Sequence, residues 1–286
     1  MGTSRWVAGL ALVVAMTTAC TAAGPAATPS APTPASTSAD PPRPAVPRVV
    51  EPTAPDLAAA VARAVDGGAG VDLAVAVLDL STGTTAGHRA DVPFHTASLS
   101  KLLVAVDLLA AGEVDDGDRD RLHRALSDSD DEAMNELWTA HDGIGAVERV
   151  AGLAGLTATH APADPAQWGD VEMSADDLVR LYRYVLTRLP EAARAFVVEA
   201  LSSAPDTAAD GFDQAFGLLT PDVGGYAKQG WMWYYPTDLY LHSAGVVGDR
   251  YVVALLSVQS STAPDDARGH LDDIAHALLS TLVPAG

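Results

Sequence analysis

The sequence predicts a two-lobed α/β (α+β) fold, with an antiparallel sheet flanked by helices and an inserted all-helical lobe. Apolar runs typical of strands occur near both ends of the predicted domain, in residues 71–89 and 225–259. Residues 99–202 carry apolar side chains at helical spacing, and no strand is expected between residues 98 and 224. We therefore expect a sheet built from N- and C-terminal segments, and a cleft between the lobes as the natural place for a site.

The beginning of this domain is predicted to be a helix followed by a hairpin. Residues 56–65 alternate apolar and polar side chains at helical spacing, and the glycines in residues 67–70 end the helix. Residues 71–80 are rich in Val, Leu and Ala, and Ser81-Thr82-Gly83 supplies a turn before the second strand at residues 84–89. This hairpin is expected to open the antiparallel sheet.

The rest of the domain divides into a helical middle and a strand-rich end. Helices are expected at residues 99–111, 118–127, 131–141, 144–154, 174–189 and 192–202. Strands are expected at residues 225–233, 239–247 and 250–259, with Gly248-Asp249 as a tight turn between the last two. A helix over residues 265–282 then closes the chain.

Residues 1–19 are predicted to be an export signal. Arg5 precedes an apolar run over residues 6–16, which is too short to span a bilayer of roughly 30 Å. Thr17-Thr-Ala-Cys20 is similar to a bacterial lipoprotein box, which implies that Cys20 is lipidated. The alternative is ordinary secretory cleavage nearby, with Cys20 incidental. Cys20 is the only cysteine, so one chain forms no internal disulfide.

Residues 20–55 are predicted to be a linker between the lipid anchor and the folded domain. Residues 21–55 hold ten of the nineteen prolines, with Ala, Thr and Ser filling most of the rest. At about 3.1 Å per residue, a polyproline-like linker reaches up to roughly 100 Å. We therefore expect a monomeric domain over residues 56–286 at the outer face of the cell membrane, or a secreted one.

The charged residues of the sequence argue against one class of partner and single out two lysines. The formal charge of −20 makes nucleic acid an unsuitable partner. Lys101 and Lys228 are the only lysines, against fifteen arginines. Because arginine supplies nearly all of the positive charge, we expect these two lysines to have specific roles.

Lys101 stands three residues after Ser98, which places the two side chains on one helical face. A serine hydroxyl needs a nearby base to take its proton when it attacks a carbonyl. The helix after Ser98 has almost no polar face, with Asp107 as its only other charge, so Lys101 is expected to be buried. Burial lowers the pKa of a lysine and makes it a usable base. The alternative is a capping serine followed by a solvated lysine.

Three segments occur in a meaningful order: Ser98-x-x-Lys101, Ser129-Asp130-Asp131 and Lys228-Gln229-Gly230. Together they resemble the signature of class A β-lactamases and penicillin-binding proteins. Asn135 matches that pattern too. The resemblance covers roughly residues 56–283 and implies the β-lactamase/transpeptidase-like fold, with no cofactor and no metal. For the second segment alone, ordinary capping of a helix N-terminus is an equal alternative.

The resemblance also implies a role for each position. Ser98 would be the nucleophile and Lys101 its base, with the Ser98 N–H as an oxyanion donor. Ser129 would relay a proton to the leaving nitrogen, and Lys228 would supply positive charge toward Ser129 and a substrate carboxylate. Further along the same strand, Gly230 would let substrate approach the backbone, and Trp231 would provide a second oxyanion N–H.

The chain departs from the family pattern at three positions. Asp131 stands where the family has asparagine, which removes an amide donor for a substrate carbonyl. Gln229 stands where the family has Thr or Ser, so a hydroxyl contact to the substrate carboxylate is lost or altered. Class A enzymes activate the deacylating water with a glutamate, and Asp164 is the candidate base in the corresponding stretch. Without such a base, an acyl-enzyme would form and then hydrolyse slowly.

Other interpretations of the sequence are weaker or stay open. The histidines show no ligand pair at helical spacing, and no Gly-x-Ser-x-Gly elbow occurs, which disfavours a metal hydrolase and an α/β-hydrolase. His242 and Ser243 are predicted near the cleft, where either a substrate contact or a structural role fits. Aromatic side chains of the same region form either a cleft wall or a core or edge cluster: Trp231, Trp233, Tyr234 and Tyr235.

The sequence thus predicts a serine acyl-enzyme hydrolase that acts through Ser98 and Lys101. Its substrates would be β-lactams or related cell-wall peptide carbonyls, such as a peptidoglycan stem peptide. One alternative is a penicillin-binding D,D-peptidase-like enzyme with slow deacylation. The other is a non-catalytic cell-wall-binding lipoprotein of the same fold, because Asp131 and Gln229 alter the expected motifs.

Overall fold

The computed structural model describes residues 56–112, 114–234 and 236–282. The predicted signal over residues 1–19, the linker over residues 20–55, Cys20 and Tyr235 lie outside the described residues. No helix in the described part of the chain is long and apolar enough to cross a membrane.

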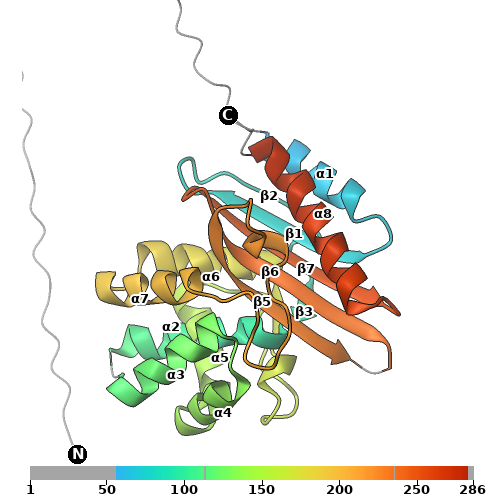
Figure 1. Cartoon of the computed structure of the whole chain (residues 1–286). Coiled ribbons are helices and arrows are strands. Elements are labelled where there is room, and N and C mark those ends of the chain that lie inside the picture. Colours follow the sequence, from blue (N-terminus) through green and yellow to red (C-terminus); the bar gives the residue numbers. More distant parts are fainter. Residues whose placement is uncertain (1–55, 113, 235, 283–286) are drawn as a thin grey trace, which may run out of the picture. The chain divides into compact units, whose positions relative to one another are not determined.

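Both ends of the domain contribute to one antiparallel sheet, as the sequence predicts (Figure 1). The N-terminal hairpin consists of β1 (Asp72–Asp79) and β2 (Thr85–His88). The C-terminal strands are β5 (Gly225–Tyr234), β6 (Asp238–Val247) and β7 (Tyr251–Ser260). The strand order is β2-β1-β7-β6-β5, so β7 from the C-terminal end pairs with β1 along its full length. The strand β5, which carries Lys228, therefore lies at one edge of the sheet.

The two faces of the sheet are covered by different helices. Helices α1 (Leu57–Gly67) and α8 (Pro264–Leu282) pack together on one face. Alternate residues of β1 divide between the faces, because side chains of a strand point to opposite sides in turn. Leu73, Val75 and Val77 belong to the cluster with α1 and α8, whereas Ala74, Ala76 and Leu78 belong to the cluster with the helical lobe.

The helical lobe lies on the other face of the sheet (Figure 1). Its helices are α2 (Lys101–Ala111), α3 (Asp116–Ser127), α4 (Asp131–Ala140), α5 (Gly143–Ala154), α6 (Ala175–Thr187) and α7 (Glu191–Ser202). Every residue of α2 from Lys101 to Leu109 is buried, which confirms the expectation from its apolar sequence. Asp107 is tolerated there because Arg149 of α5 donates two hydrogen bonds to it, at 2.9 and 2.7 Å.

The structure corrects two local predictions. A short strand, β4 (Glu172–Ser174), lies between residues 98 and 224 and pairs with β3 (Pro93–His95). Three residues are too few for a strand pattern to stand out, so the sequence predicted none. The helix expected from residue 99 instead begins as a 3-10 turn, η1 (Ala97–Ser100), before α2. The β3–β4 pair brings the chain to this turn, because Thr96 N–H donates to Val171 O at 2.8 Å.

Candidate active site

Ser98 lies in the 3-10 turn η1, where the helical lobe meets the edge strand β5. The residue before it, Ala97, has a left-handed backbone with φ of 47°, a conformation that side chains other than glycine adopt at a cost. Gly230 of β5 allows the close approach, because a Cβ built on it would lie 2.7 Å from Thr96 O. Ser98 is buried except for 5% of its surface.

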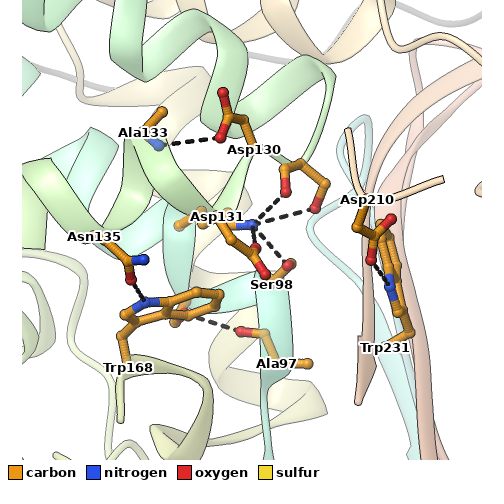
Figure 2. A network of polar contacts seen from close by, with 12 residues as sticks. Ala97, Ser98, Asp130, Asp131, Ala133, Asn135, Trp168, Asp210 and Trp231 are labelled. Atoms are coloured by element: carbon orange, nitrogen blue, oxygen red, sulfur yellow. Dashed lines mark hydrogen bonds and ion pairs between the residues drawn. The ribbon is translucent and has the colours of Figure 1, made fainter. Parts of the chain in front are cut away.

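Lys101 follows Ser98 by one 3-10 turn, a spacing at which side chains nearly eclipse. Its Nζ therefore donates to Ser98 Oγ at 2.9 Å. The same ammonium group is 2.7 Å from Ser129 O and 2.6 Å from Asp131 Oδ1, at the start of α4 (Figure 2). The Lys101 side chain is fully buried, whereas that of Asp131 is 56% exposed. The structure thus brings Ser98 and Lys101 within hydrogen-bond distance, and it adds a contact between Lys101 and the Asp131 carboxylate that the sequence pattern did not predict.

Ser129 connects the two lysines. It lies between α3 and α4 with a left-handed backbone, φ 56°, and its Oγ is 3.4 Å from Lys101 Nζ. Lys228 Nζ reaches the same hydroxyl at 2.8 Å from β5. Tyr182 of α6 holds this strand in place, because its hydroxyl accepts from Lys228 N–H and donates to Ala244 O. A continuous polar chain runs from Ser98 through Lys101 and Ser129 to Lys228.

Burial controls the charge of both lysines. It lowers the pKa of Lys101 below its ordinary value, and the attraction of Asp131 only partly opposes that effect. Burial also lowers the pKa of Lys228 well below the ordinary value, and the nearby Lys101 lowers it further. A neutral lysine can accept a proton, so both groups can take part in proton transfer.

Ser98 opens into a cavity of about 440 Å³ between the two lobes. Asp131, Asn135 and Trp168 belong to the helical-lobe side, and Asp210, Trp231 and Met232 to the side of the sheet. In Figure 2, Ser98 lies between Trp168 and Trp231. The remaining lining comes from Ala97 and from the loop residues Ala166, Gln167, Gly169 and Asp170. A substrate carbonyl in this cavity would have direct access to the Ser98 hydroxyl.

Trp168 covers Lys101 from the loop that precedes β4. Its ring centroid is 4.8 Å from Lys101 Nζ, and its Nε1 donates to Asn135 Oδ1 at 2.8 Å. The beginning of the loop is anchored by the fully buried Asp177 of α6, which accepts from Thr157 N–H and from Ala158 N–H at 2.7 Å. An indole ring with no basic atom therefore occupies the space beside the base.

Asp164, the candidate deacylating base, does not line the cavity. It is exposed, and its Oδ1 accepts from Ala166 N–H at 3.0 Å within the loop. Two other carboxylates, Asp170 and Asp210, line the cavity, and the sequence reasoning did not identify them. Asp170 ends the three-residue 3-10 turn η2 (Trp168–Asp170), and Asp210 stands in a loop, so neither segment shows a period and only the tertiary fold reveals their position.

The remaining candidates on β5, Gln229 and Trp231, lie two residues apart on the same face of the strand but have different surroundings. Gln229 is fully buried and its amide nitrogen donates to Gln214 O and Phe216 O, away from the cavity. This contact fixes the loop that carries Asp210. Trp231 lines the cavity, and its Nε1 donates to Asp210 Oδ2 at 2.9 Å. Its ring stacks on Phe212 with centroids 4.8 Å apart.

His242 and Ser243 have structural roles. His242 is fully buried, with Nε2 2.8 Å from His95 O and Nδ1 accepting from Ser257 N–H. Burial lowers its pKa to about 4. Ser243 Oγ accepts from Leu218 N–H at 3.0 Å. Of the other aromatic candidates, Trp233 is 56% exposed, and Tyr234 stacks on His95, so neither lines the cavity.

The fold and the Ser98–Lys101 pair define a β-lactamase-like protein. The family model described as "Beta-lactamase enzyme family" matches residues 56–122, which include both residues. Solved β-lactamases from Chitinophaga pinensis and Burkholderia vietnamiensis match with TM-scores of 0.63 at 14% and 18% identity. The matches cover 76% and 80% of this chain and 97% and 98% of those structures. The chain therefore has a β-lactamase-like fold, and residues 56–122 match the sequence pattern of the β-lactamase enzyme family.

A curated relative has higher sequence identity to this chain than the two solved β-lactamases have. The chain is 36% identical over 213 residues to the Mycobacterium tuberculosis protein described as "Putative lipoprotein LppW". This alignment covers 69% of the chain and 66% of that relative, just under two thirds of the relative's own length. The protein of the same description in Mycobacterium bovis matches with the same identity and coverage.

Proposed function

We propose that this protein forms a covalent acyl-enzyme at Ser98 with β-lactams or with related cell-wall peptide carbonyls. The observation that carries the proposal is the polar chain from Ser98 through Lys101 and Ser129 to Lys228, which begins at the cavity. Burying a lysine costs free energy. Two buried lysines on either side of one serine hydroxyl therefore give the fold no structural advantage, which favours a chemical role for them.

Acylation would begin with proton transfer from Ser98 to neutral Lys101, over the 2.9 Å that separate their polar atoms. The Ser98 oxygen forms a bond to the substrate carbonyl carbon, and negative charge develops on the carbonyl oxygen. Backbone N–H groups of Ser98 and Trp231 are the proposed donors to that oxygen. Two donors aimed at the developing charge lower the barrier without protein rearrangement.

Release of the leaving group requires a proton on its nitrogen. Lys101 would return the proton through the Ser129 hydroxyl as the carbon–nitrogen bond breaks. Lys228, 2.8 Å from Ser129 Oγ, holds that hydroxyl in position and favours its transient negative charge. The product of this step is an ester of Ser98, which water must then hydrolyse.

A penicillin-binding type of behaviour, with slow deacylation, is the second candidate. Trp168 supports it, because its ring, which has no basic atom, lies 4.8 Å from Lys101 Nζ and occupies space beside Lys101. Asp164, which could have activated a water, is exposed and bonded within its own loop. We therefore expect the acyl-enzyme to persist. The description of the Mycobacterium tuberculosis relative as a lipoprotein also supports a lipid-anchored location through Cys20, at the outer face of the membrane.

Time-resolved intact-mass measurement of residues 54–286 with a panel of penicillins and cephalosporins tests the proposal. We expect a single adduct that remains for many minutes, and no adduct on Ser98→Ala. An adduct that clears while the drug is consumed would indicate an efficient β-lactamase. Absence of any adduct would favour the non-catalytic cell-wall-binding protein, and release of D-alanine from a stem-peptide mimic would indicate a D,D-peptidase.

A variant of Trp168 tests why the adduct persists. Trp168→Ala removes the ring beside Lys101 and opens that side of the base to water, so the adduct lifetime should shorten several-fold. Trp168→Phe keeps a ring and serves as the matched control, with a lifetime close to that of the wild type. Equal lifetimes in all three proteins would show that Trp168 does not limit deacylation.

A further inference from the structure

Carboxylates dominate the lining of the Ser98 cavity. Asp131, Asp170 and Asp210 line it, whereas no arginine or lysine does so among the residues that the structure describes. Ser98 is the proposed nucleophile of this site. The three carboxylates give its surroundings negative charge, and this charge determines which substrates the site favours. An acyl donor with positive charge is therefore favoured over a purely anionic one.

The two lysines behind Ser98 do not cancel this negative charge. Both are buried to 1% exposure and lie outside the cavity lining. Each is already bonded, Lys101 to Ser98, Ser129 and Asp131, and Lys228 to Ser129 and Gln229 O. Burial lowers the pKa of both lysines, and the nearby Lys101 lowers that of Lys228 further.

Asp131 is the carboxylate best placed to select a substrate. One of its oxygens, Oδ1, accepts from Lys101 at 2.6 Å, and the side chain is 56% exposed toward solvent and lines the cavity. An ionised carboxylate accepts hydrogen bonds and donates none. Asparagine at this position could donate to a substrate carbonyl, whereas Asp131 repels a carbonyl oxygen and attracts an N–H donor.

Aromatic rings supplement the carboxylates on both sides of the cavity. Trp168 lies beside Asp131 and Lys101, and Trp231 is fixed by Asp210 and Phe212. Indole rings attract cations through their π faces. Gln229, which stands where the family pattern has a hydroxyl, donates to Phe216 O under the loop and does not line the cavity.

We propose that the cavity accepts acyl donors that carry a protonated amine near the reacting carbonyl, with Asp131 as the specificity-determining residue. This inference rests on the proposed acylation of Ser98. It identifies the substrate class as acyl donors with an ammonium group in the side chain next to the reacting ring, in which the ammonium contacts Asp131 while Ser98 attacks the reacting carbonyl.

A matched pair of penicillins tests the inference, benzylpenicillin and its α-amino derivative ampicillin, which differ by one amine. At about pH 6 the amine is protonated, since α-amino groups titrate near 7.7–8.0. We expect ampicillin to acylate Ser98 about tenfold faster, and the ratio to fall to about one in Asp131→Asn. At about pH 9 the wild-type preference should disappear because the amine is neutral. Asp222→Asn removes an exposed carboxylate outside the cavity lining and should keep the preference.

Equilibrium binding to Ser98→Ala separates this inference from the acylation proposal. Titration calorimetry with the two penicillins should show the same preference for ampicillin, again lost when Asp131→Asn is added. Acylation of the wild type with no preference in either experiment would overturn the inference and leave the proposed function standing. A preference in binding without any acylation would support the ammonium site and refute the acyl-enzyme.

Discussion

The charge of Lys101 depends on two opposing effects at the scale of a single residue. Burial favours the neutral amine, and the carboxylate of Asp131 at 2.6 Å favours the ammonium form. Burial is the stronger effect, so the pKa of Lys101 lies below its ordinary value. Because the proposed acylation needs the neutral form, we expect Asp131 to slow it in the absence of a substrate amine that would share its charge.

Asp131→Asn should therefore change the pH dependence of acylation. Loss of the carboxylate lowers the pKa of Lys101 further, so the rising limb of the acylation rate against pH moves to lower pH. On that limb, the neutral fraction of Lys101 at a given pH rises about tenfold when its pKa falls by one. Stopped-flow acylation by benzylpenicillin, which has no amine, measures this between about pH 5 and pH 9. A limb that stays in place would mean that Lys101 is not the titrating base.

The chemistry of single residues was the part of the site most open to sequence reasoning. The structure places four predicted site residues close together: Ser98, Lys101, Ser129 and Lys228. Their proximity was predictable because the spacing and order of their motifs match a known pattern. Trp168 and Asp210 were not recognised as site residues, since each reaches the cavity from a loop whose course depends on distant anchors. The anchors are the buried side chains of Asp177 and Gln229.

At the scale of elements, the site depends on how closely η1 approaches β5. Gly230 has no side chain, and a Cβ there would be 2.7 Å from Thr96 O and 3.2 Å from Leu99 Cγ. The order of the long strands and helices was predictable from periodicity. The short β3–β4 pair and the 3-10 turn were not predictable, because three or four residues are too few to show a period. These short elements nevertheless hold Ser98 in place.

Gly230→Ala should disable acylation with a moderate effect on stability. The added methyl group must push η1 away from β5, and overpacking of this kind costs about 1–3 kcal/mol. We expect the acylation rate to fall by at least about tenfold, because Ser98 and the N–H of Trp231 separate. Gly169→Ala is the matched control, since its nearest contacts would be 3.9 Å. Equal rates in the two variants, measured by intact mass, would contradict the role of the close approach.

At the scale of the whole molecule, the sheet contributes side chains to two hydrophobic clusters of the described residues, one on each of its faces. His242 of β6 connects the sheet to the β3 region, through His95 O and Ser257 N–H. The neutral ring fits these partners when Nε2 carries the proton, because Nδ1 must then accept. If Nδ1 were also protonated, its N–H would face the N–H of Ser257, and the two donors would oppose each other.

Stability should therefore fall in mild acid. The pKa of His242 is about 4 in the folded protein and about 6.5 when unfolded, so the unfolded state binds the proton first. The contribution is fully present above pH 6.5 and is lost as the pH falls toward 4, by about 3 kcal/mol. Urea unfolding at several pH values measures this. His242→Gln should be less stable at neutral pH and show a flatter dependence, and an unchanged slope would assign the effect to other groups.

The burial of both lysines also determines how the protein responds to amine-reactive reagents. Lys101 and Lys228 are each 1% exposed, and the sequence has no other lysine. In the native protein an acylating label would therefore reach neither lysine side chain. Modification at Lys101 or Lys228 would occur only when the helical lobe and β5 separate. The extent of lysine labelling over time thus reports directly on opening of the catalytic centre, without any engineered probe.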